Sequence, residues 1–488
     1  MNVTDLDPQG ERLPIKIDST SNGEFLPQAL SAASLAGNKL ATERAYKYAS
    51  RTGLSRRQFM MSAMGAASTL LAHNDAHAKS GSQGGWYDLP QIASVDADAA
   101  TELLAKRELI FDFQGHFVNP TGKWLEKLPP QARPLAGLPK AQCEAAQAGG
   151  DRSYLECLSG DEFIKDVFLD SDTDLMVLSF VPSAADAEPL TIEEAAAVRD
   201  IVNKMERHRM FLHGRVNPNQ PGDLDLMEDL VGRWDICAWK CYTQFGPGGK
   251  GFWLDDEPGI ALIEKARALD VRNICIHKGL SFGPRSFEHS RCDDIGRVAR
   301  RYPDVNFLVY HSGYDVIQEE GPFKPGAGVH GIDSLVQSLL DNEVPPNSNV
   351  YAELGSSWRM LMQKPTEAAH ALGKLFRYVG ENNLLWGTDS IWYGSPQDQI
   401  QAFRSFQISP EFQDRYEYPA ITPAMRSKVF GLNALKPYNL TLAEVEGMIG
   451  QDRVQTARAE YSEQPNPSFR TFGPKNRREF LNLRSWGG

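Results

Sequence analysis

Eight short apolar runs divide the chain between residues 107 and 389, and stretches with helical periodicity separate most of them. The runs cover residues 107–113, 174–181, 211–216, 236–242, 271–277, 305–311, 349–354 and 383–389. Short, continuous apolar runs are typical of strands buried on both faces, which helices connect in parallel sheets. Eight such units predict an α/β fold, a (β/α)8 or TIM barrel. A doubly wound open sheet is the alternative, but FDFQGHF (111–117) lacks the glycine-rich turn usual after its first strand.

Two stretches fall outside this alternation. Residues 117–170 form a long insertion after the first run, and loops in that position lie over the carboxyl ends of the barrel strands, so we expect a lid or a pocket wall. Residues 438–488 form a C-terminal extension, which we expect to pack on the barrel or on a second subunit; a disordered tail is the alternative. The barrel is therefore assigned to 107–437, with a linker at 79–106.

Residues 1–78 are predicted to be a polar leader and an export signal outside the fold. Residues 55–60 read SRRQFM, and a short Ala- and Gly-rich apolar stretch follows, then Ala76-His77-Ala78. This order is that of a twin-arginine signal, and a chance Arg-Arg pair before an alanine-rich helix is the alternative. Cleavage after Ala78 would leave 488 − 78 = 410 residues. We therefore expect the twin-arginine export machinery as a partner and the periplasm as the destination.

Composition excludes several classes of function. The formal net charge of −12 argues against nucleic acid as a partner, because nucleic-acid binding needs basic surfaces. The sequence contains no apolar run of about 18 residues, so no membrane-spanning helix is expected. Six cysteines do not make a dense disulfide framework, and a Cys143–Cys157 bridge stays open.

Four polar residues stand at or just after the ends of apolar runs. They are His116, His277, His311 and Asp389. In a parallel barrel the carboxyl ends of all strands open onto one face, so these side chains are expected to converge. Imidazole and carboxylate groups suit Zn²⁺, Mn²⁺ or Fe²⁺, and the pattern predicts a metal site.

With these residues in place, the chain resembles the amidohydrolase superfamily, in the branch that includes aminocarboxymuconate-semialdehyde decarboxylase. The resemblance covers about 107–437. It depends on D-x-x-x-H ending at His116, on His277, on H-x-G from His311, on W-G-T-D ending at Asp389, and on the closing RSKVFGLNALKPY (426–438).

The resemblance implies roles for individual residues. The metal ligands are Gln114, His116, His277 and Asp389, with zinc as the expected ion and manganese or iron as alternatives. Asp389 and His311 are the implied catalytic groups, acting on metal-activated water. Gln114 departs from the pattern, because the family has His or Glu there; the neutral amide is a weaker ligand, and whether it contacts the ion stays open.

The resemblance implies a metal-dependent hydrolase of a small carboxylated, aromatic or cyclic substrate. A non-oxidative decarboxylase is the first alternative, and a secreted barrel that has lost its chemistry and only binds is the second. Polar and aromatic residues near the expected barrel mouth are candidates for substrate binding. They are Arg215, Lys240, Lys278, Trp358, Arg359 and Trp392. A homodimer is compatible with the aromatic tail.

Overall fold

The computed structural model describes most of the 488-residue chain. The described residues are 12–105, 108–127, 143, 154–184, 187–205, 208–281, 287–326, 329–449 and 452–484. The central part of the predicted insertion, residues 128–142 and 144–153, lies outside them.

Eight parallel strands form one sheet in strict sequence order, as predicted. They are β2 (Phe111–Gly115), β3 (Leu175–Leu178), β4 (Met210–Arg215), β5 (Ile236–Tyr242), β6 (Asn273–His277), β7 (Asn306–Tyr310), β8 (Val350–Glu353) and β9 (Leu384–Leu385). The sheet closes on itself, because the Phe113 amide donates to the Trp386 carbonyl at 3.0 Å and Gly115 bridges Ser390 in parallel. The fold is a TIM barrel.

The strand register sets the height of the site residues. Tyr242 on β5 is paired with His277 on β6, and His277 is paired with Tyr310 on β7. His311 therefore follows one residue above the row of His277. Below that row the barrel is filled by apolar and aromatic side chains, including Phe111, Phe113 and Leu308. The residues above this plug project into the carboxyl end of the barrel.

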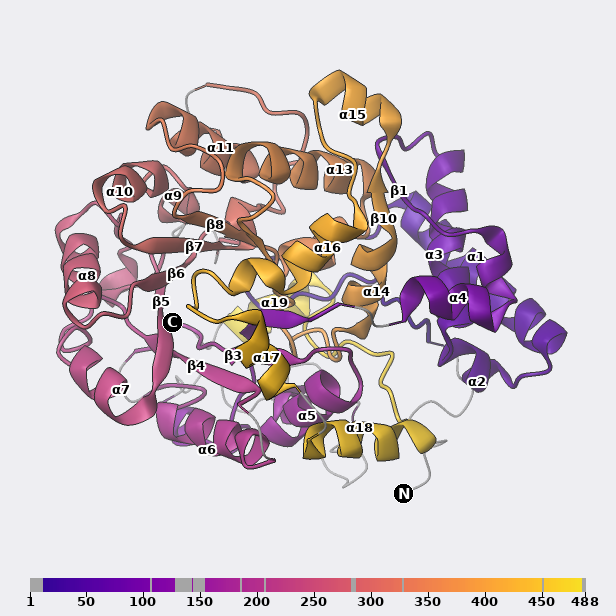
Figure 1. Ribbon diagram of the computed structural model, residues 1–488, viewed down its shortest axis with the longest axis horizontal. Coiled ribbons are helices and arrows are strands. Elements are labelled where there is room, and N and C mark those ends of the chain that lie inside the picture. The colour runs from indigo at the N-terminus through magenta and orange to yellow at the C-terminus, as the bar shows by residue number, and fades with distance from the viewer. Residues whose placement is uncertain are drawn as a thin grey trace.

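Helices surround the barrel as Figure 1 shows. Those between or after the strands are α5 (Gly160–Ile164), α6 (Ile192–Asn203), α7 (Met227–Trp234), α8 (Glu257–Ala268), α9 (Phe287–Ser290), α10 (Ile295–Arg301), α11 (Ile332–Asp341), α12 (Ser357–Leu361), α13 (Pro365–Lys374), α14 (Gln397–Ser405), α15 (Pro410–Tyr416) and α16 (Pro423–Phe430). Local sequence starts several of them: Thr191 and Glu194 form a reciprocal capping box at α6, and Thr422 caps α16.

The amino end of the barrel is closed by the chain that follows α16. The Asn433 side-chain amide donates to the Glu381 and Leu384 carbonyls, both at 2.8 Å. The Tyr438 ring packs against Phe113 with ring centroids 4.9 Å apart. The closing motif at 426–438 therefore packs against the amino ends of the strands.

The N-terminal segment is packed on the barrel, which corrects the expectation that it lies outside the fold. It contains α1 (Ala32–Thr52), α2 (Arg56–Met60), α3 (Ala63–Lys79), β1 (Gly85–Tyr87) and α4 (Ala97–Leu104), drawn in indigo and violet in Figure 1. Strand β1 pairs antiparallel with β10 (Phe406–Ile408). Phe59 and Met60 of the paired-arginine motif belong to the main hydrophobic core, as do Leu70 and Leu71. Burial of these apolar side chains stabilises the folded state, and a polar leader in solution would lack that stabilisation.

The C-terminal extension also packs on the barrel, through α17 (Leu442–Met448), α18 (Arg453–Glu463) and α19 (Arg477–Arg484). Fully buried Arg209 at the start of β4 holds the N-cap of α18, with its Nε 2.5 Å and its Nη2 3.0 Å from the two Asp452 oxygens. In the insertion, Cys143 and Cys157 are joined in a disulfide. The bridge that the sequence left open is therefore formed.

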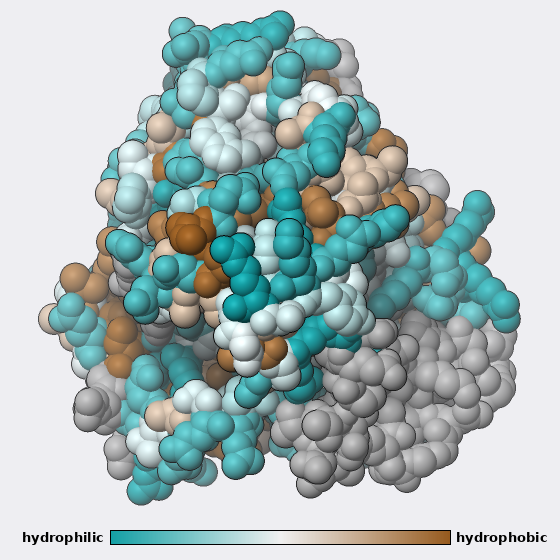
Figure 2. Space-filling model, turned by 90° about the vertical axis from the view of Figure 1, so that its right-hand side faces the viewer, coloured by the Kyte–Doolittle hydropathy of each residue, from teal (hydrophilic) through white to brown (hydrophobic). Residues whose placement is uncertain are grey.

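Among the described residues on the side turned to the viewer in Figure 2, most are hydrophilic, and the hydrophobic ones lie in small, separate groups. Among the described residues, no helix is both long enough and apolar enough to cross a membrane.

Candidate functional site

The four predicted strand-end residues converge at the carboxyl end of the barrel. His116 follows β2, His277 ends β6, His311 follows β7 and Asp389 follows β9. All four side chains are at most 2% exposed. His116 Nε2 lies 3.2 Å from Asp389 Oδ1, and His311 Nε2 lies 3.1 Å from His277 Nδ1. Residues separated by more than 270 positions therefore form one cluster.

The carboxamide of Gln114 lies inside this cluster. Its Nε2 is 2.9 Å from Asp389 Oδ1, 3.3 Å from His116 Nε2 and 3.5 Å from His311 Nε2. The amide therefore joins His116 to Asp389. His116 Nε2 and Asp389 Oδ1 are two acceptors close to each other, and the amide hydrogens lie where a shared cation could otherwise bind them both. Its Oε1 is buried and has no hydrogen-bond partner among the described residues.

Burial keeps the three imidazoles neutral. Loss of water lowers the pKa of His116 and that of His277, and it lowers the pKa of His311 to about 4. Burial acts to raise the pKa of Asp389, but its contacts with His116, His311 and Ser356 outweigh burial and hold the pKa below its ordinary value. The site thus combines neutral nitrogen donors with an ionised carboxylate.

Carbonyl partners assign the protons on two of the rings. His311 Nδ1 donates to the Gly355 carbonyl at 2.6 Å, so its Nε2 carries the lone pair. His277 Nε2 points at the Leu280 carbonyl at 3.4 Å, so its Nδ1 carries the lone pair. The two lone pairs face each other across 3.1 Å, which is a separation that two neighbouring ligands of one ion can have. The donor set therefore fits a divalent metal ion.

Two residues of the N-terminal segment enter the same site. Asn22 Nδ2 donates to Asp389 Oδ2 at 3.0 Å, and Glu24 Oε1 lies 3.6 Å from His277 Nδ1. The donor atoms of Glu24, His277 and His311 all lie within 4.8 Å of one another. Sequence reasoning missed both residues, because they stand in an aperiodic polar stretch assigned to a leader.

Other buried groups support the cluster from below. Glu353 accepts the His311 amide at 3.0 Å, and burial raises the pKa of this carboxyl to about 8. Asp112 accepts the amides of Gln114 and Thr388, each at 3.1 Å, and burial raises its pKa to about 7. Asp112 thus orients the backbone that carries Gln114.

The backbone is strained at three positions around the cluster. His311, Ser356 and Asp389 have φ values of 63°, 49° and 59°, in the left-handed region that non-glycine residues rarely adopt. The Ser356 hydroxyl donates to Asp389 Oδ2. Such conformations are kept only where surrounding contacts determine them, and they concentrate at functional sites.

Two of the six predicted substrate-binding residues lie at the cluster. The Trp392 ring stacks on His116 with centroids 5.4 Å apart. Lys240 is fully buried, and burial lowers its pKa. Its Nζ lies 3.9 Å above the Tyr310 ring centre and has no hydrogen-bond partner among the described residues.

The other four have packing or ion-pair partners within the protein. Trp358 is packed in the core against Phe403 and Phe406. Lys278 is buried in an ion pair with Asp294 at 2.9 Å. Arg215 pairs with Glu188 at 2.6 Å and Asp223 at 3.2 Å, and Arg359 pairs with Asp18 at 3.0 Å. Each side chain is held by packing or by a neighbouring carboxylate, which the run-end pattern could not reveal.

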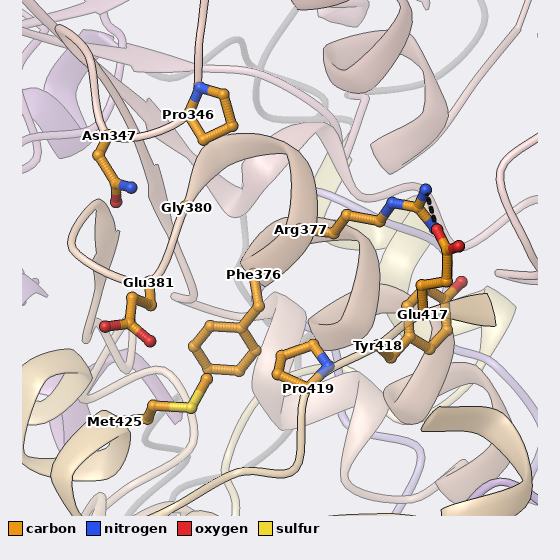
Figure 3. Close-up of a pocket in the computed structure, with 10 residues that line it drawn as sticks. All are labelled: Pro346, Asn347, Phe376, Arg377, Gly380, Glu381, Glu417, Tyr418, Pro419 and Met425. Atoms are coloured by element: carbon orange, nitrogen blue, oxygen red, sulfur yellow. Dashed lines mark ion pairs between the residues drawn. The ribbon is translucent and has the colours of Figure 1, made fainter. Parts of the chain in front are cut away.

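A separate pocket lies at the opposite end of the barrel (Figure 3). Residues that precede β8 and β9 line it, among them Asn347 and Glu381. Because catalytic groups of such barrels lie at the carboxyl ends of the strands, this pocket is not part of the candidate site.

A closed parallel barrel with buried imidazoles and a carboxylate at the carboxyl ends of its strands defines a class of TIM-barrel enzymes. The model of the amidohydrolase family matches residues 166–440, more than half of the chain, and the chain therefore belongs to this family. It is accordingly an enzyme of the amidohydrolase superfamily, which acts on small molecules. No curated protein matches it.

Several solved structures are similar to this chain at low identity. A TIM-barrel protein from Bordetella bronchiseptica is 14% identical over 69% of this chain and 99% of its own, with a TM-score of 0.41. The 5-carboxyvanillate decarboxylase LigW from Sphingomonas paucimobilis is 12% identical over 69% of this chain and 100% of its own, with a TM-score of 0.43. A 2,6-dihydroxybenzoate decarboxylase from Rhizobium is 13% identical over 68% and 99%, with a TM-score of 0.38. At this level of similarity they carry no argument about the substrate.

Proposed function

We propose that this enzyme is a metal-dependent hydrolase of a small carboxylated, aromatic or cyclic substrate. The observation that carries the proposal is the pair of neutral imidazoles, His277 and His311, whose lone pairs face each other at 3.1 Å in a buried site. These two residues would hold the ion, and zinc is the expected metal, with manganese or iron as alternatives. When bound, such an ion would polarise a carbonyl group of the substrate and lower the pKa of a water molecule.

In this proposal His311 moves from the catalytic role that the resemblance implies to the metal. His116 and Asp389, which the resemblance implies as metal ligands, handle the proton instead. Asp389 is ionised and is held by the side chains of Asn22, Gln114 and Ser356, so it is oriented to accept a proton. Its Oδ1 is 3.2 Å from His116 Nε2, which offers a second acceptor for the same proton. The Trp392 ring, stacked on His116, offers a flat apolar surface that suits an aromatic or cyclic substrate.

Metal content and activity of two variants test this division of roles. His277→Ala should lose stoichiometric metal in elemental analysis, whereas Asp389→Asn should keep it and lose turnover by at least about 100-fold, the usual size of a proton-transfer contribution. Wild-type protein that holds no stoichiometric metal would refute the proposal. Asp389→Asn with unchanged turnover would refute the assignment of the proton acceptor.

The reaction type is tested on a panel of aromatic carboxylates, lactones and amides. Hydrolysis products without release of carbon dioxide support the proposal. Release of carbon dioxide without uptake of water would assign the alternative, a non-oxidative decarboxylase of the same superfamily.

We further propose that the enzyme is exported by the twin-arginine route to the periplasm. Support comes from the SRRQFM motif at 55–60 and from the Cys143–Cys157 disulfide, since such bridges persist in oxidising compartments. The route suits a protein that folds and takes up a metal ion before export. A fusion of residues 1–80 to a reporter that folds only in the cytoplasm would test it, and loss of export in the Arg56→Lys, Arg57→Lys variant is the expected result.

A further inference from the structure

The chain before α1 is fixed across the carboxyl end of the barrel. Lys16 Nζ donates to the Ser395 carbonyl at 2.7 Å and lies 3.4 Å from Asp398 Oδ1. Thr20 Oγ1 is 2.6 Å from Thr471 Oγ1, and the Ser21 amide donates to the Pro474 carbonyl at 2.9 Å. The segment therefore lies between the barrel loops and the C-terminal extension, with contacts to both.

Asn22 turns this segment so that Glu24 faces the imidazole pair. The Glu24 amide donates to Asn22 Oδ1 at 2.9 Å, while Asn22 Nδ2 donates to Glu24 Oε2 at 2.6 Å and to Asp389 Oδ2 at 3.0 Å. Gly23 between them has a φ of 96°, which favours glycine. The second carboxylate oxygen, Glu24 Oε1, is the atom that lies 3.6 Å from His277 Nδ1.

The donor atoms then divide into two groups. His116 and Asp389 are joined by the amide of Gln114, a neutral hydrogen-bond donor. His277, His311 and Glu24 present two imidazole nitrogens and a carboxylate oxygen within 4.8 Å of one another. Two histidines and one glutamate form a donor set that holds zinc in catalytic sites with one position left for water or substrate. Gln114 is neutral, so the first strand supplies no carboxylate at this position. Glu24 of the N-terminal segment can supply that negative charge instead.

We propose that Glu24 is a ligand of the metal ion, together with His277 and His311. This inference rests on the proposed metal dependence. It means that the catalytic centre is complete only while residues 12–25 remain on the barrel, and that residues assigned to a leader by sequence belong to the site.

The test measures metal affinity of the full-length chain by competition of Zn²⁺ with a chromophoric chelator. Glu24→Gln, which keeps the shape and removes the charge, should weaken binding by at least about 100-fold, because even partners outside the coordination sphere contribute about 10–100-fold. Glu43→Gln is the matched control, since Glu43 is exposed on α1 of the same segment, and its affinity should equal that of the wild type. Unfolding temperature in excess chelator shows whether each variant keeps the fold without the ion.

Two further measurements separate this inference from the metal proposal. Co²⁺-loaded wild type and Glu24→Gln should differ in visible absorption, which reports the ligand set independently of turnover. His116→Gln should weaken Zn²⁺ binding by less than about 10-fold, since the side chain of His116 contacts Gln114 and Asp389, which are not among the three proposed ligands. Metal-binding wild type with equal affinity and equal Co²⁺ spectrum in Glu24→Gln would overturn the role of Glu24 alone. Wild type without metal affinity would overturn both proposals.

Discussion

Replacing Gln114 by glutamate is the sharpest test of the arrangement at the first strand. The change is isosteric, but it places a carboxylate oxygen where the amide nitrogen now lies, 2.9 Å from Asp389 Oδ1. Two unit charges at that distance repel by about 6 kcal/mol at an effective dielectric constant of about 20. Protonating a glutamate at pH 7 costs only about 4 kcal/mol, given an ordinary pKa of about 4.3 and about 1.4 kcal/mol per unit. Protonation is the cheaper route, so Gln114→Glu should carry a shared proton.

The expected destabilisation of the metal-free variant is therefore about 4 kcal/mol at pH 7, falling by about 1.4 kcal/mol for each unit by which the pH is lowered towards 4. A divalent ion next to His311 would take over the role of that proton, and 4 kcal/mol corresponds to as much as about 1000-fold tighter binding. Chemical unfolding in the presence of chelator, repeated from pH 5 to pH 8, measures the first quantity. Chelator competition measures the second.

Gln91→Glu is the control, because Gln91 is exposed and the change in net charge is the same. If Gln114→Glu unfolds like this control at every pH and binds Zn²⁺ no more tightly than the wild type, then the side chain of residue 114 does not join His116 to Asp389. The reasoning from the 2.9 Å contact would be refuted.

Three other predictions concern the parts of the fold that surround the site. Asp452→Asn keeps the N-cap acceptor of α18 but leaves the buried Arg209 guanidinium with only the more distant Asp174 carboxylate, 3.9 Å from its Nη1, so the free energy of unfolding should fall by about 3 kcal/mol; an unchanged denaturant midpoint would contradict this. Burial raises the pKa of Asp112 to about 7, so the contribution of its protonated form to stability is present below pH 4 and is lost as the pH rises through 7. Asp112→Asn can keep the same contacts, so it should be more stable than the wild type by up to about 4 kcal/mol at pH 8.5 and should match it at low pH. Unfolding curves at both pH values would show this. Intact-mass measurement of exported protein should find residues 12–78 retained, because Ala76 at the predicted cleavage site is buried in helix α3; a mature chain that begins at residue 79 would contradict both this and the role of Glu24.

Most of the barrel could be predicted from sequence. The eight apolar runs became eight parallel strands in the predicted order, because continuous apolar runs have few other ways to bury both faces. The ends shifted by a few residues, and the last run shortened to Leu384–Leu385, since the exact bounds depend on pairing with neighbours. The helices between the runs followed from their caps and their apolar faces.

The candidate site was predicted in part. His116, His277, His311 and Asp389 were found because each stands at the end of a run, and parallel strands end on the same face. The sequence positions of Trp358 and Lys278 do not reveal that one packs in the core and the other pairs with Asp294. The grouping of donor atoms around Gln114 depends on distances of about 3 Å that spacing along the chain does not contain.

By itself, the sequence determined the class of fold and the face on which chemistry takes place, because strand and helix periodicity and strand polarity are local properties of the chain. Only the tertiary structure decided that residues 12–104 are part of the folded enzyme, and that Asn22 and Glu24 reach Asp389 and His277. Those contacts join residues more than 250 positions apart through a segment with no periodic pattern. They arise from burial and hydrogen bonds with the barrel loops and the C-terminal extension, which exist only once the whole chain is folded.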